Sequence, residues 1–378
     1  MRVLITGGAG FVGSHLAERF LREGFQVRIL DSLDPRVHPH GRPVWIPGEA
    51  EFIHGDVTDR RALRGALEGV DIVSHQAAYQ DYMPDFSRFL GVNAVGTALL
   101  YELIVAERWK IKKIIVASSQ AVYGEGQYIC PAHGFFQPAP RSQEQLSAGD
   151  WGVACAKCHG HAEPCLLEEA HTNPYNQYAV SKLAEEKIAL GLGWLHGIPS
   201  VGLRYSITQG PRQSLFNQYS GICRIFVGRA LQGRPLRIYE DGLQTRDFVH
   251  IEDVVAANMR VLESDAADFQ AFNVGSGHAT TVARYAELVR QAVSPNVEFE
   301  FAGEYRRGDN RHSVSSIDKL KALGWAPRHD LSTILEDFLT WVESIGGIPA
   351  QIEDAHGAMR EAGVVLASSA GVPAACAK

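Results

Sequence analysis

The sequence predicts an α/β protein built on a Rossmann-like, doubly wound parallel sheet, and two observations carry this prediction. The chain begins with an apolar segment, RVLIT, that runs into a glycine-rich turn and then into apolar residues at helical spacing. Further along, short apolar segments alternate with helical patterns, which is typical of a parallel sheet covered on both faces. With 378 residues, of which 46% are hydrophobic, the chain is long enough for one large domain or two ordinary ones.

The composition argues against several classes of protein. A net charge of −7 and a pI near 6.1 disfavour binding to nucleic acid or to an anionic membrane. No apolar run reaches the roughly 20 residues of a membrane span, and Met1 leads directly into the first expected strand without a signal peptide. Six cysteines in such a chain are better read as thiols or metal ligands than as disulfides. We therefore expect a cytoplasmic protein with no nucleic-acid or membrane partner.

The first turn has the pattern of a dinucleotide site. Glycines at the spacing G-x-x-G-x-x-G let the backbone turn tightly, approach a pyrophosphate and pack the following helix against the strand. The next expected strand, FQVRIL, ends in an aspartate whose carboxylate would bind the adenosine ribose and repel a 2′-phosphate, which favours NAD over NADP. The residues expected to contact NAD here are Gly7, Gly10, Phe11, Val12, Gly13 and Asp31.

The alternation of strands and helices continues to residue 119. We expect strands within 51–57, 71–78 and 112–119, with helices over 59–70 and 93–109 between them. Ligands of such sheets bind at the carboxyl ends of the strands. Further NAD contacts are therefore expected at Asp56, Val57, Ala77, Ala78 and Asn93.

A serine, a tyrosine and a lysine form the candidate catalytic group. Ser119 ends the fifth expected strand, and Tyr178 and Lys182 lie one helical turn apart in YAVSK. The lysine ammonium and a positively charged nicotinamide ring both favour the phenolate form of the tyrosine. Tyr178 would then take a proton from a substrate hydroxyl while hydride leaves for NAD, with Ser119 bound to the same oxygen. Tyr178 and Lys182 are also expected to contact NAD.

These motifs together resemble the extended short-chain dehydrogenase/reductase family, and within it nucleotide-sugar epimerases and dehydratases of the UDP-galactose 4-epimerase type. The resemblance rests on GGAGFVG, Asp31, HQAA, SSQAVYG, YAVSK, LRY and RDFVHIEDVV, and covers about residues 1–340. It implies an NAD-binding domain over 1–200, a smaller nucleotide-sugar-binding domain mainly over 201–345, and a homodimer formed through two helices. It also implies that Arg246 and arginines of RRGDNRH, Arg307 and Arg311, bind the sugar diphosphate. The tail, 346–378, is expected to be partly helical and then disordered.

The residues after Ser119 indicate which reaction of that family to expect. Dehydratases of this type carry an acidic pair there and decarboxylating relatives a glutamate, whereas this chain has Gln120 and Ala121, which cannot act as general acid or base. Epimerisation of a dTDP- or UDP-hexose at C4 through a keto sugar is therefore the leading interpretation. The alternatives are a dehydratase, decarboxylase or net dehydrogenase of the same family, or a non-enzymatic NAD-binding scaffold. Tyr79, Tyr82 and Gln120 are expected to contact the sugar, and Ile207 stands where the family commonly has an asparagine.

A long insert, residues 124–172, separates the serine from the tyrosine and has no clear helical or strand period. It contains C-x-x-H, at Cys130 and His133, and C-x-x-C, at Cys155 and Cys158, which is the spacing of a Cys3His zinc ribbon. Cys165, His159 or His161 is the alternative to His133 as fourth ligand. The insert is therefore expected to be a flap stabilised by a structural zinc, and it resembles the cysteine-bearing insert of some bacterial epimerases thought to act on dTDP-L-rhamnose.

Overall fold

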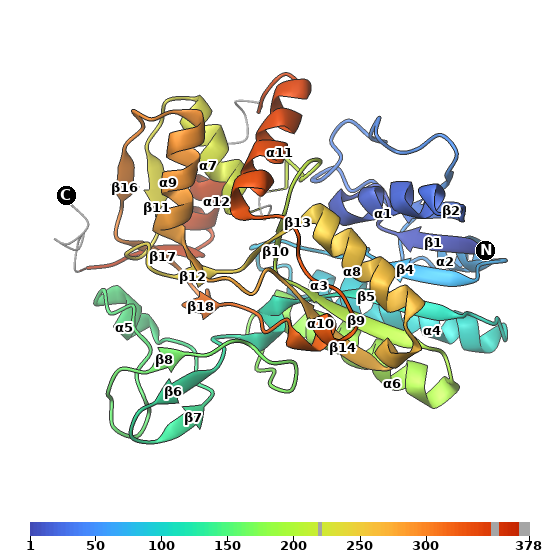
Figure 1. Ribbon diagram of the computed structural model, residues 1–378, viewed down its shortest axis with the longest axis horizontal. Helices are drawn as coiled ribbons and strands as arrows, with labels where there is room; N and C mark the ends of the chain where they lie inside the picture. Colours follow the sequence, from blue (N-terminus) through green and yellow to red (C-terminus); the bar gives the residue numbers. More distant parts are fainter. Residues whose placement is uncertain (218–220, 349–354, 370–378) are drawn as a thin grey trace.

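A seven-stranded, fully parallel sheet forms the centre of the computed structural model, which describes residues 1–217, 221–348 and 355–369 (Figure 1). Its strand order is β14-β9-β5-β4-β1-β2-β3, the order of a doubly wound dinucleotide-binding sheet. The strands are β1 (Arg2–Thr6), β2 (Gln26–Asp31), β3 (Glu51–His54), β4 (Ile72–His75), β5 (Lys113–Ser119), β9 (Ser200–Tyr205) and β14 (Gln270–Val274). The predicted fold class is confirmed.

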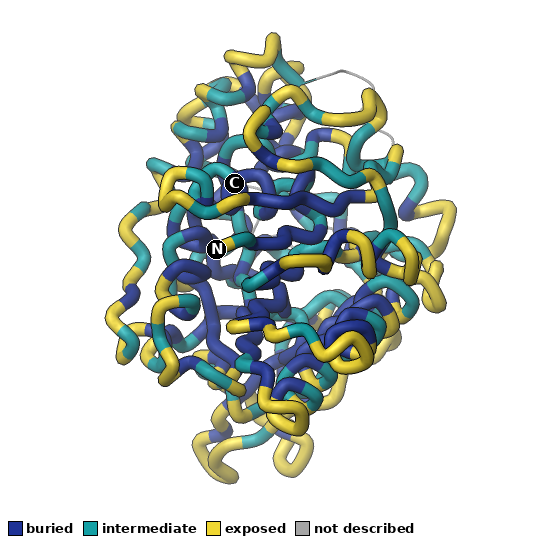
Figure 2. Tube along the Cα trace, turned by 90° about the vertical axis from the view of Figure 1, so that its right-hand side faces the viewer, coloured by how far each residue is buried: buried dark blue, intermediate teal, exposed yellow. Residues whose placement is uncertain are grey.

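Helices cover both faces of the sheet, and alternate residues of one strand point to opposite faces. On β1, Val3 and Ile5 pack toward α1 (Phe11–Arg22) and α8 (Ile251–Glu263). Leu4 packs in the other core, with the helices α2 (Arg60–Leu67) and α4 (Gly96–Ala106) and with residues of α6 (Gln177–His196). Figure 2 shows the buried strands running through the middle of the molecule.

The second part of the molecule has its own apolar core. Its helices α7 (Ile222–Leu231), α9 (Val282–Val293) and α11 (Leu331–Ser344) pack around the strand pair β11 (Leu236–Ile238) and β16 (Phe299–Phe301). Short strands join the two parts: β10 (Ile207–Gln209), β12 (Thr245–Arg246), β13 (Phe248–His250), β15 (Thr280–Thr281), β17 (Glu304–Arg306) and β18 (His312–Ser313). Two short helices of the later sequence, η3 (Asp265–Ala267) and α10 (Asp318–Ala322), pack instead on the first part, beside β9 and β14.

The chain passes between the two parts more than once. After residue 200 it still supplies β9, β14 and α8 to the first part, so a division of the sequence at 200 separates the two parts only approximately.

Between β4 and α4 the chain forms α3 (Phe86–Phe89) and a π-helical turn, η1 (Leu90–Val95), which together with α4 make one long helix. By length and composition, the helix Phe86–Ala106 could cross a bilayer. In this structure, however, 56% of its most apolar 18-residue stretch is buried inside the protein.

The insert folds as a small lobe, which we call the flap, seen below β18 in Figure 1. It follows η2 (Gln120–Tyr123) and contains β6 (Tyr128–Cys130), β7 (Gly134–Phe136), α5 (Gln143–Ser147) and β8 (Glu163–Pro164). Leu146 and Trp151 of the flap pack against Tyr305 of β17, and Leu167 exchanges backbone hydrogen bonds with Val314 and Ser316. The flap is therefore attached to the segment 304–316.

A buried group of charges lies where the flap meets the second part. Arg141 donates to both carboxylate oxygens of Glu240, at 3.0 and 3.1 Å, and Arg311 pairs with Glu240 and Asp241. Glu125 accepts the backbone amide of Arg311 and lies 3.5 Å from the Arg141 Nε atom. Three carboxylates thus share two guanidinium groups. Burial raises the pKa of Glu125 to about 7, although the positive charge of Arg141 acts to lower it.

Replacing Glu125 by glutamine is expected to remove a pH-dependent loss of stability. The pKa of Glu125 is about 7 in the folded protein and about 4.5 in the unfolded chain. Between pH 4.5 and pH 7 the folded protein therefore binds more protons than the unfolded chain. The free energy of unfolding of the wild-type protein therefore falls as pH rises through this window. Urea denaturation should show E125Q equal to the wild-type protein near pH 5 and more stable near pH 8, by on the order of 2 kcal/mol. The exposed flap variant E163Q is the control, and a parallel pH dependence of E125Q and the wild-type protein would contradict this result.

The C-terminal segment folds against the second part instead of leaving it. α12 (Ala355–Glu361) falls within the stretch expected to be helical, and β19 (Val365–Ala367) pairs antiparallel with β17. No alternating pattern predicts β19, because a strand of three residues is too short to show one. The disorder predicted for the last dozen residues concerns mainly 370–378, which lie outside the described residues.

Candidate active site

A large cleft of about 1510 Å³ opens at the carboxyl ends of the sheet strands and extends between the two parts of the molecule. A smaller cavity of about 140 Å³ adjoins it at the ends of β2, β3 and β4. Fifteen of the predicted site residues line the cleft: Gly7, Gly10, Phe11, Val12, Gly13, Asp56, Ala78, Tyr79, Tyr82, Ser119, Gln120, Tyr178, Lys182, Arg246 and Arg307. Asp31, Val57 and Ala77 line the smaller cavity.

The glycine loop has the close packing that a dinucleotide site requires. A Cβ atom on Gly13 would lie 2.3 Å from the Gly7 carbonyl oxygen, and one on Gly7 would lie 2.7 Å from the backbone of Ala77. No side chain caps α1 at its N-cap residue, Gly10, so the first amides of this helix are available to a phosphate. These residues fit an NAD pyrophosphate.

Asp31 is positioned by the same loop. One carboxylate oxygen accepts the amide of Ala9 at 2.9 Å, and the other accepts the amide of Leu33 at 2.8 Å. Each oxygen keeps capacity for a further hydrogen bond, which suits the two hydroxyls of an adenosine ribose.

The three candidate catalytic residues reach the cleft from two elements. Ser119 ends β5 and caps the 3-10 turn η2 by accepting the amide of Ala121 at 3.1 Å. Tyr178 stands in the first turn of α6, whose N-cap residue Asn176 accepts the Ala179 amide at 2.8 Å. The amide nitrogen of Gln80 donates to the Tyr178 hydroxyl oxygen at 2.7 Å.

Lys182 is the cation beneath this tyrosine. Its ammonium group donates to the Ala117 carbonyl at 2.6 Å and to Glu185 at 2.7 Å, and the side chain is buried. Burial first, and then the charge of Lys182, lower the pKa of nearby His75 to about 3, so that imidazole is neutral. Burial raises the pKa of Glu185 to about 7 against the opposing effect of Lys182.

Tyrosines and arginines form the wall of the cleft beyond Tyr178. Arg306 donates to the Tyr82 hydroxyl at 2.7 Å and lies 4.0 Å from the centre of its ring. Arg246 donates to the Asn310 carbonyl at 3.0 Å and to Asp309 at 3.3 Å. The Tyr79 hydroxyl donates to Asp85, and Gln120 accepts the Ser313 hydroxyl at 3.0 Å.

Two residues predicted to contact a ligand lie outside both cavities. Asn93 lines neither cavity, because its amide group is bound to the backbone of Tyr79 and to Ser181, so it holds the loop after β4 in place. Arg311 also lies outside both cavities, because Glu240 and Asp241 hold its guanidinium group in the flap junction.

Among the cleft arginines that sequence reasoning missed, Arg306 and Arg224 lie near Tyr82. Arg307 is exposed, whereas its neighbour Arg306 contacts Tyr82, and nothing in RRGDNRH distinguishes the two. Arg224 is buried at the start of α7 and lines the cleft. A signal existed for it, since a charged residue between the buried residues Cys223 and Phe226 departs from the apolar pattern of that helix.

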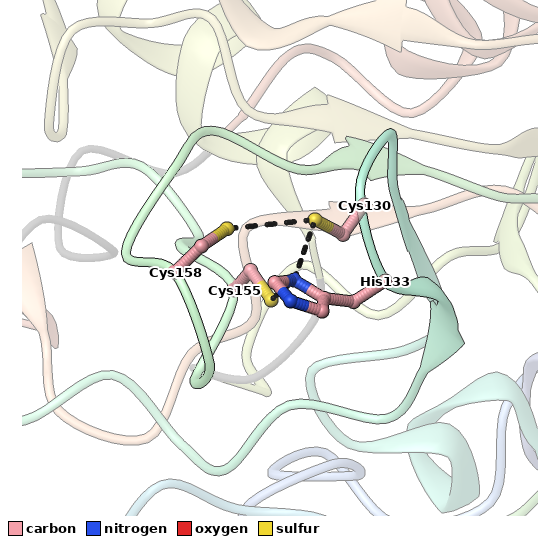
Figure 3. A group of neighbouring side chains, drawn as sticks. All are labelled: Cys130, His133, Cys155 and Cys158. Atoms are coloured by element: carbon pink, nitrogen blue, oxygen red, sulfur yellow. Dashed lines mark hydrogen bonds between the residues drawn. The ribbon is translucent and has the colours of Figure 1, made fainter.

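The flap brings its four candidate metal ligands together (Figure 3). Their ligand atoms all lie within 4.8 Å of one another; Cys130 Sγ is 3.7 Å from Cys158 Sγ and 3.6 Å from His133 Nδ1, and Cys155 Sγ is 3.5 Å from the same nitrogen. Tetrahedral zinc would give S···S separations of about 3.8 Å and S···N separations of about 3.6 Å. The group contains His133, and Cys165, His159 and His161 lie outside it.

A glycine loop opening a helix, and a serine, tyrosine and lysine set over a seven-stranded parallel sheet, define an extended short-chain dehydrogenase/reductase. More closely, the chain belongs to the NAD dependent epimerase/dehydratase family, whose sequence profile matches residues 3–143 and 155–275. The interruption of this match falls within the flap.

Individual relatives agree with this assignment. The chain is 32% identical over 351 residues to a dTDP-L-rhamnose 4-epimerase of Burkholderia thailandensis, covering 90% of this chain and 94% of the relative. Among solved structures it resembles a Thermus thermophilus UDP-glucose 4-epimerase in complex with NAD, with 29% identity, coverage of 90% and 98%, and a TM-score of 0.71. It also resembles a UDP-N-acetylglucosamine 4-epimerase of Methanobrevibacter ruminantium, with 26% identity, coverage of 91% and 98%, and a TM-score of 0.71.

Proposed function

We propose that this protein is an NAD-dependent nucleotide-sugar epimerase that inverts C4 of a dTDP- or UDP-linked hexose. The observation that carries the proposal is the cleft in which Ser119, Tyr178 and Lys182 meet a dinucleotide-type glycine loop. The 4-epimerases among its relatives support the position of the inverted carbon, and the dTDP-L-rhamnose enzyme supports a deoxyhexose.

In this proposal the residues act on one hydroxyl of the sugar. NAD, which the glycine loop and Asp31 would hold, would supply a reversible hydride acceptor for the carbon that carries this hydroxyl. Tyr178 takes the hydroxyl proton as the carbonyl forms. It returns this proton after the keto sugar has rotated in the site to present its other face. Lys182 and the Gln80 amide stabilise the phenolate, and Ser119 binds the reacting oxygen. Reduction of the keto sugar on its opposite face would invert the carbon with no net oxidation of the sugar.

The residues beside Ser119 support epimerisation over elimination. Gln120 and Ala121 supply no general acid or base, and Gln120 is bound to Ser313. A 4,6-dehydratase needs an additional proton-transfer group near the sugar, and Tyr82 is committed to Arg306.

A proton NMR time course with UDP-, dTDP-, GDP- and CDP-sugars, run while the absorbance of reduced cofactor is followed, tests this function. A stereoisomer formed without net reduction of NAD would establish it and identify the substrate. A product lacking water or CO2, or steady accumulation of reduced cofactor, would instead indicate a dehydratase, decarboxylase or dehydrogenase. Binding of NAD without turnover of any sugar would indicate a scaffold.

We also propose that the Cys130, His133, Cys155 and Cys158 group binds one structural zinc ion. The three sulfur–sulfur and sulfur–nitrogen separations given above fit a tetrahedral site, and four protein ligands would leave no position for substrate. Each ligand turn is closed by a backbone hydrogen bond to its first ligand, from the His133 amide to Cys130 and from the His159 amide to Cys155. A residue with positive φ follows the second ligand of each turn, Gly134 and His159.

A homodimer through the helices Phe86–Ala106 and α6 completes the proposal. These two helices pack together and carry exposed apolar side chains, among them Phe86, 60% exposed, and Trp194, 71% exposed; the others are Leu90, Val95, Val105, Val180 and Leu195. Sedimentation equilibrium should give twice the chain mass. The variant V95E/V180E should give the chain mass, and a monomeric wild-type protein would contradict the proposal.

A further inference from the structure

Arginines are the dominant charged residues of the cleft, and all but two of those that line it are paired with carboxylates. Arg36 and Arg88 pair with Asp34, Arg229 and Arg237 with Glu300, and Arg246 and Arg306 with Asp309. Arg307 is exposed to water. Arg224 is the remaining one, buried and without a carboxylate within ion-pair distance among the described residues.

The side chain of Arg224 is poorly satisfied by the protein. It is 2% exposed, and its Nη1 atom donates to the Leu215 carbonyl at 3.0 Å. Its Nε and Nη2 atoms have no hydrogen-bond partner in the part of the chain that the structure describes. Burial lowers its pKa to about 10, which still leaves it charged at neutral pH. A buried cation with unpaired donors destabilises the fold unless a ligand supplies the missing anion.

The start of α7 presents a second feature at the same place. The N-cap residue Gly221 has left-handed backbone, φ 62°, and no described side chain caps the helix. Gly221, Ile222 and Arg224 all line the cleft. The unbonded first amides and the positive end of this ten-residue helix therefore face the same space as the unpaired guanidinium group.

The charges around Tyr82 indicate which anion belongs there. Arg224, Arg246 and Arg306 all act electrostatically on this tyrosine, together with the carboxylate of Asp309. Three cations and one carboxylate leave two positive charges, which is the charge that a nucleotide-sugar diphosphate would neutralise. Without Arg224 these side chains would carry only one net positive charge.

We propose that Arg224 and the first turn of α7 bind the diphosphate of the substrate, together with Arg246 and Arg306. The identity of the substrate as a nucleotide sugar rests on the proposed function. Arg224 is then a specificity-determining residue that distinguishes a nucleoside diphosphate from a monophosphate, because only the second phosphate satisfies its unpaired donors.

Isothermal titration of the NAD-loaded, full-length protein with UDP, dTDP, UMP and dTMP tests this role without requiring turnover. In R224M the affinity for the diphosphates should fall about 10- to 100-fold while the affinity for the monophosphates changes little. R224K should recover part of the loss. R284Q, an exposed arginine variant on α9, should behave as the wild-type protein.

Thermal unfolding separates a binding role from a structural one. Because R224M removes a buried charge without a partner, its melting temperature without nucleotide should equal or exceed that of the wild-type protein. Its stabilisation by UDP or dTDP should shrink. A lower melting temperature without nucleotide, or equal loss of affinity for mono- and diphosphates, would overturn the inference. Wild-type protein that binds none of the four nucleotides would overturn the proposed substrate class as well.

Discussion

Replacing Tyr178 by phenylalanine should lower kcat about 10²- to 10⁴-fold, the range expected when a positioned proton-transfer group is lost. The hydroxyl of Tyr178 is the titratable group that the cleft holds between the Gln80 amide and the turn of α6 that carries Lys182. Phenylalanine keeps the ring and its packing against Phe89. Affinity for NAD and for UDP or dTDP should therefore change little, as measured by isothermal titration beside the NMR assay of turnover.

A matched control for Y178F is Y101F, which removes a buried tyrosine hydroxyl away from the cleft. That hydroxyl is bound to Ser200 at 2.7 Å, so Y101F should cost about 1 kcal/mol of stability and leave turnover unchanged. If Y178F keeps more than a tenth of wild-type turnover, Tyr178 is not the proton-transfer group, and Asp81 of the cleft becomes the next residue to replace.

Loss of the proposed flap zinc is the second change for which we expect a large effect. Structural zinc contributes about 10–16 kcal/mol of apparent binding energy, and under the proposal this energy would stabilise a flap that has only small apolar clusters. C158S should contain no zinc by elemental analysis, against one zinc per chain in the wild-type protein, and should unfold at lower temperature. Because the flap is attached to the segment that carries Arg306 and Asp309, KM for the nucleotide sugar should rise more than the dissociation constant of NAD.

The control for C158S lies in the same flap. Cys165 is outside the ligand group, so C165S should keep its zinc, its melting temperature and its KM. Equal effects of the two substitutions, or wild-type protein that holds no metal after purification without chelators, would rule out the zinc site.

The parts of this molecule that follow from local sequence could be predicted. The glycine loop, the alternation of strands and helices and the i, i+4 spacing of Tyr178 and Lys182 are short-range patterns, and the structure contains all of them. The two paired ligand turns of the flap are also local, and the structure brings them together.

The arginines were harder because their roles depend on distant partners. Arg311 carries the same chemistry as Arg306, yet Glu240 and Asp241, about 70 residues away, hold it outside the cleft. Arg224 faces the cleft only because α7 packs on the second core with Cys223 and Phe226 inward. No spacing rule contains these long-range choices.

The pairing of β19 with β17 has a consequence for how the protein is made. Domains fold largely in the order in which the ribosome releases them, beginning at the N-terminus. The parallel sheet is complete once β14 has emerged, with Tyr178 and Lys182 already in place, whereas the partner of the strand that carries Arg306 is among the last segments to be synthesised. The nascent chain can therefore hold its cofactor before it can enclose a sugar, and the bound cofactor can stabilise the half-made protein during the remainder of translation.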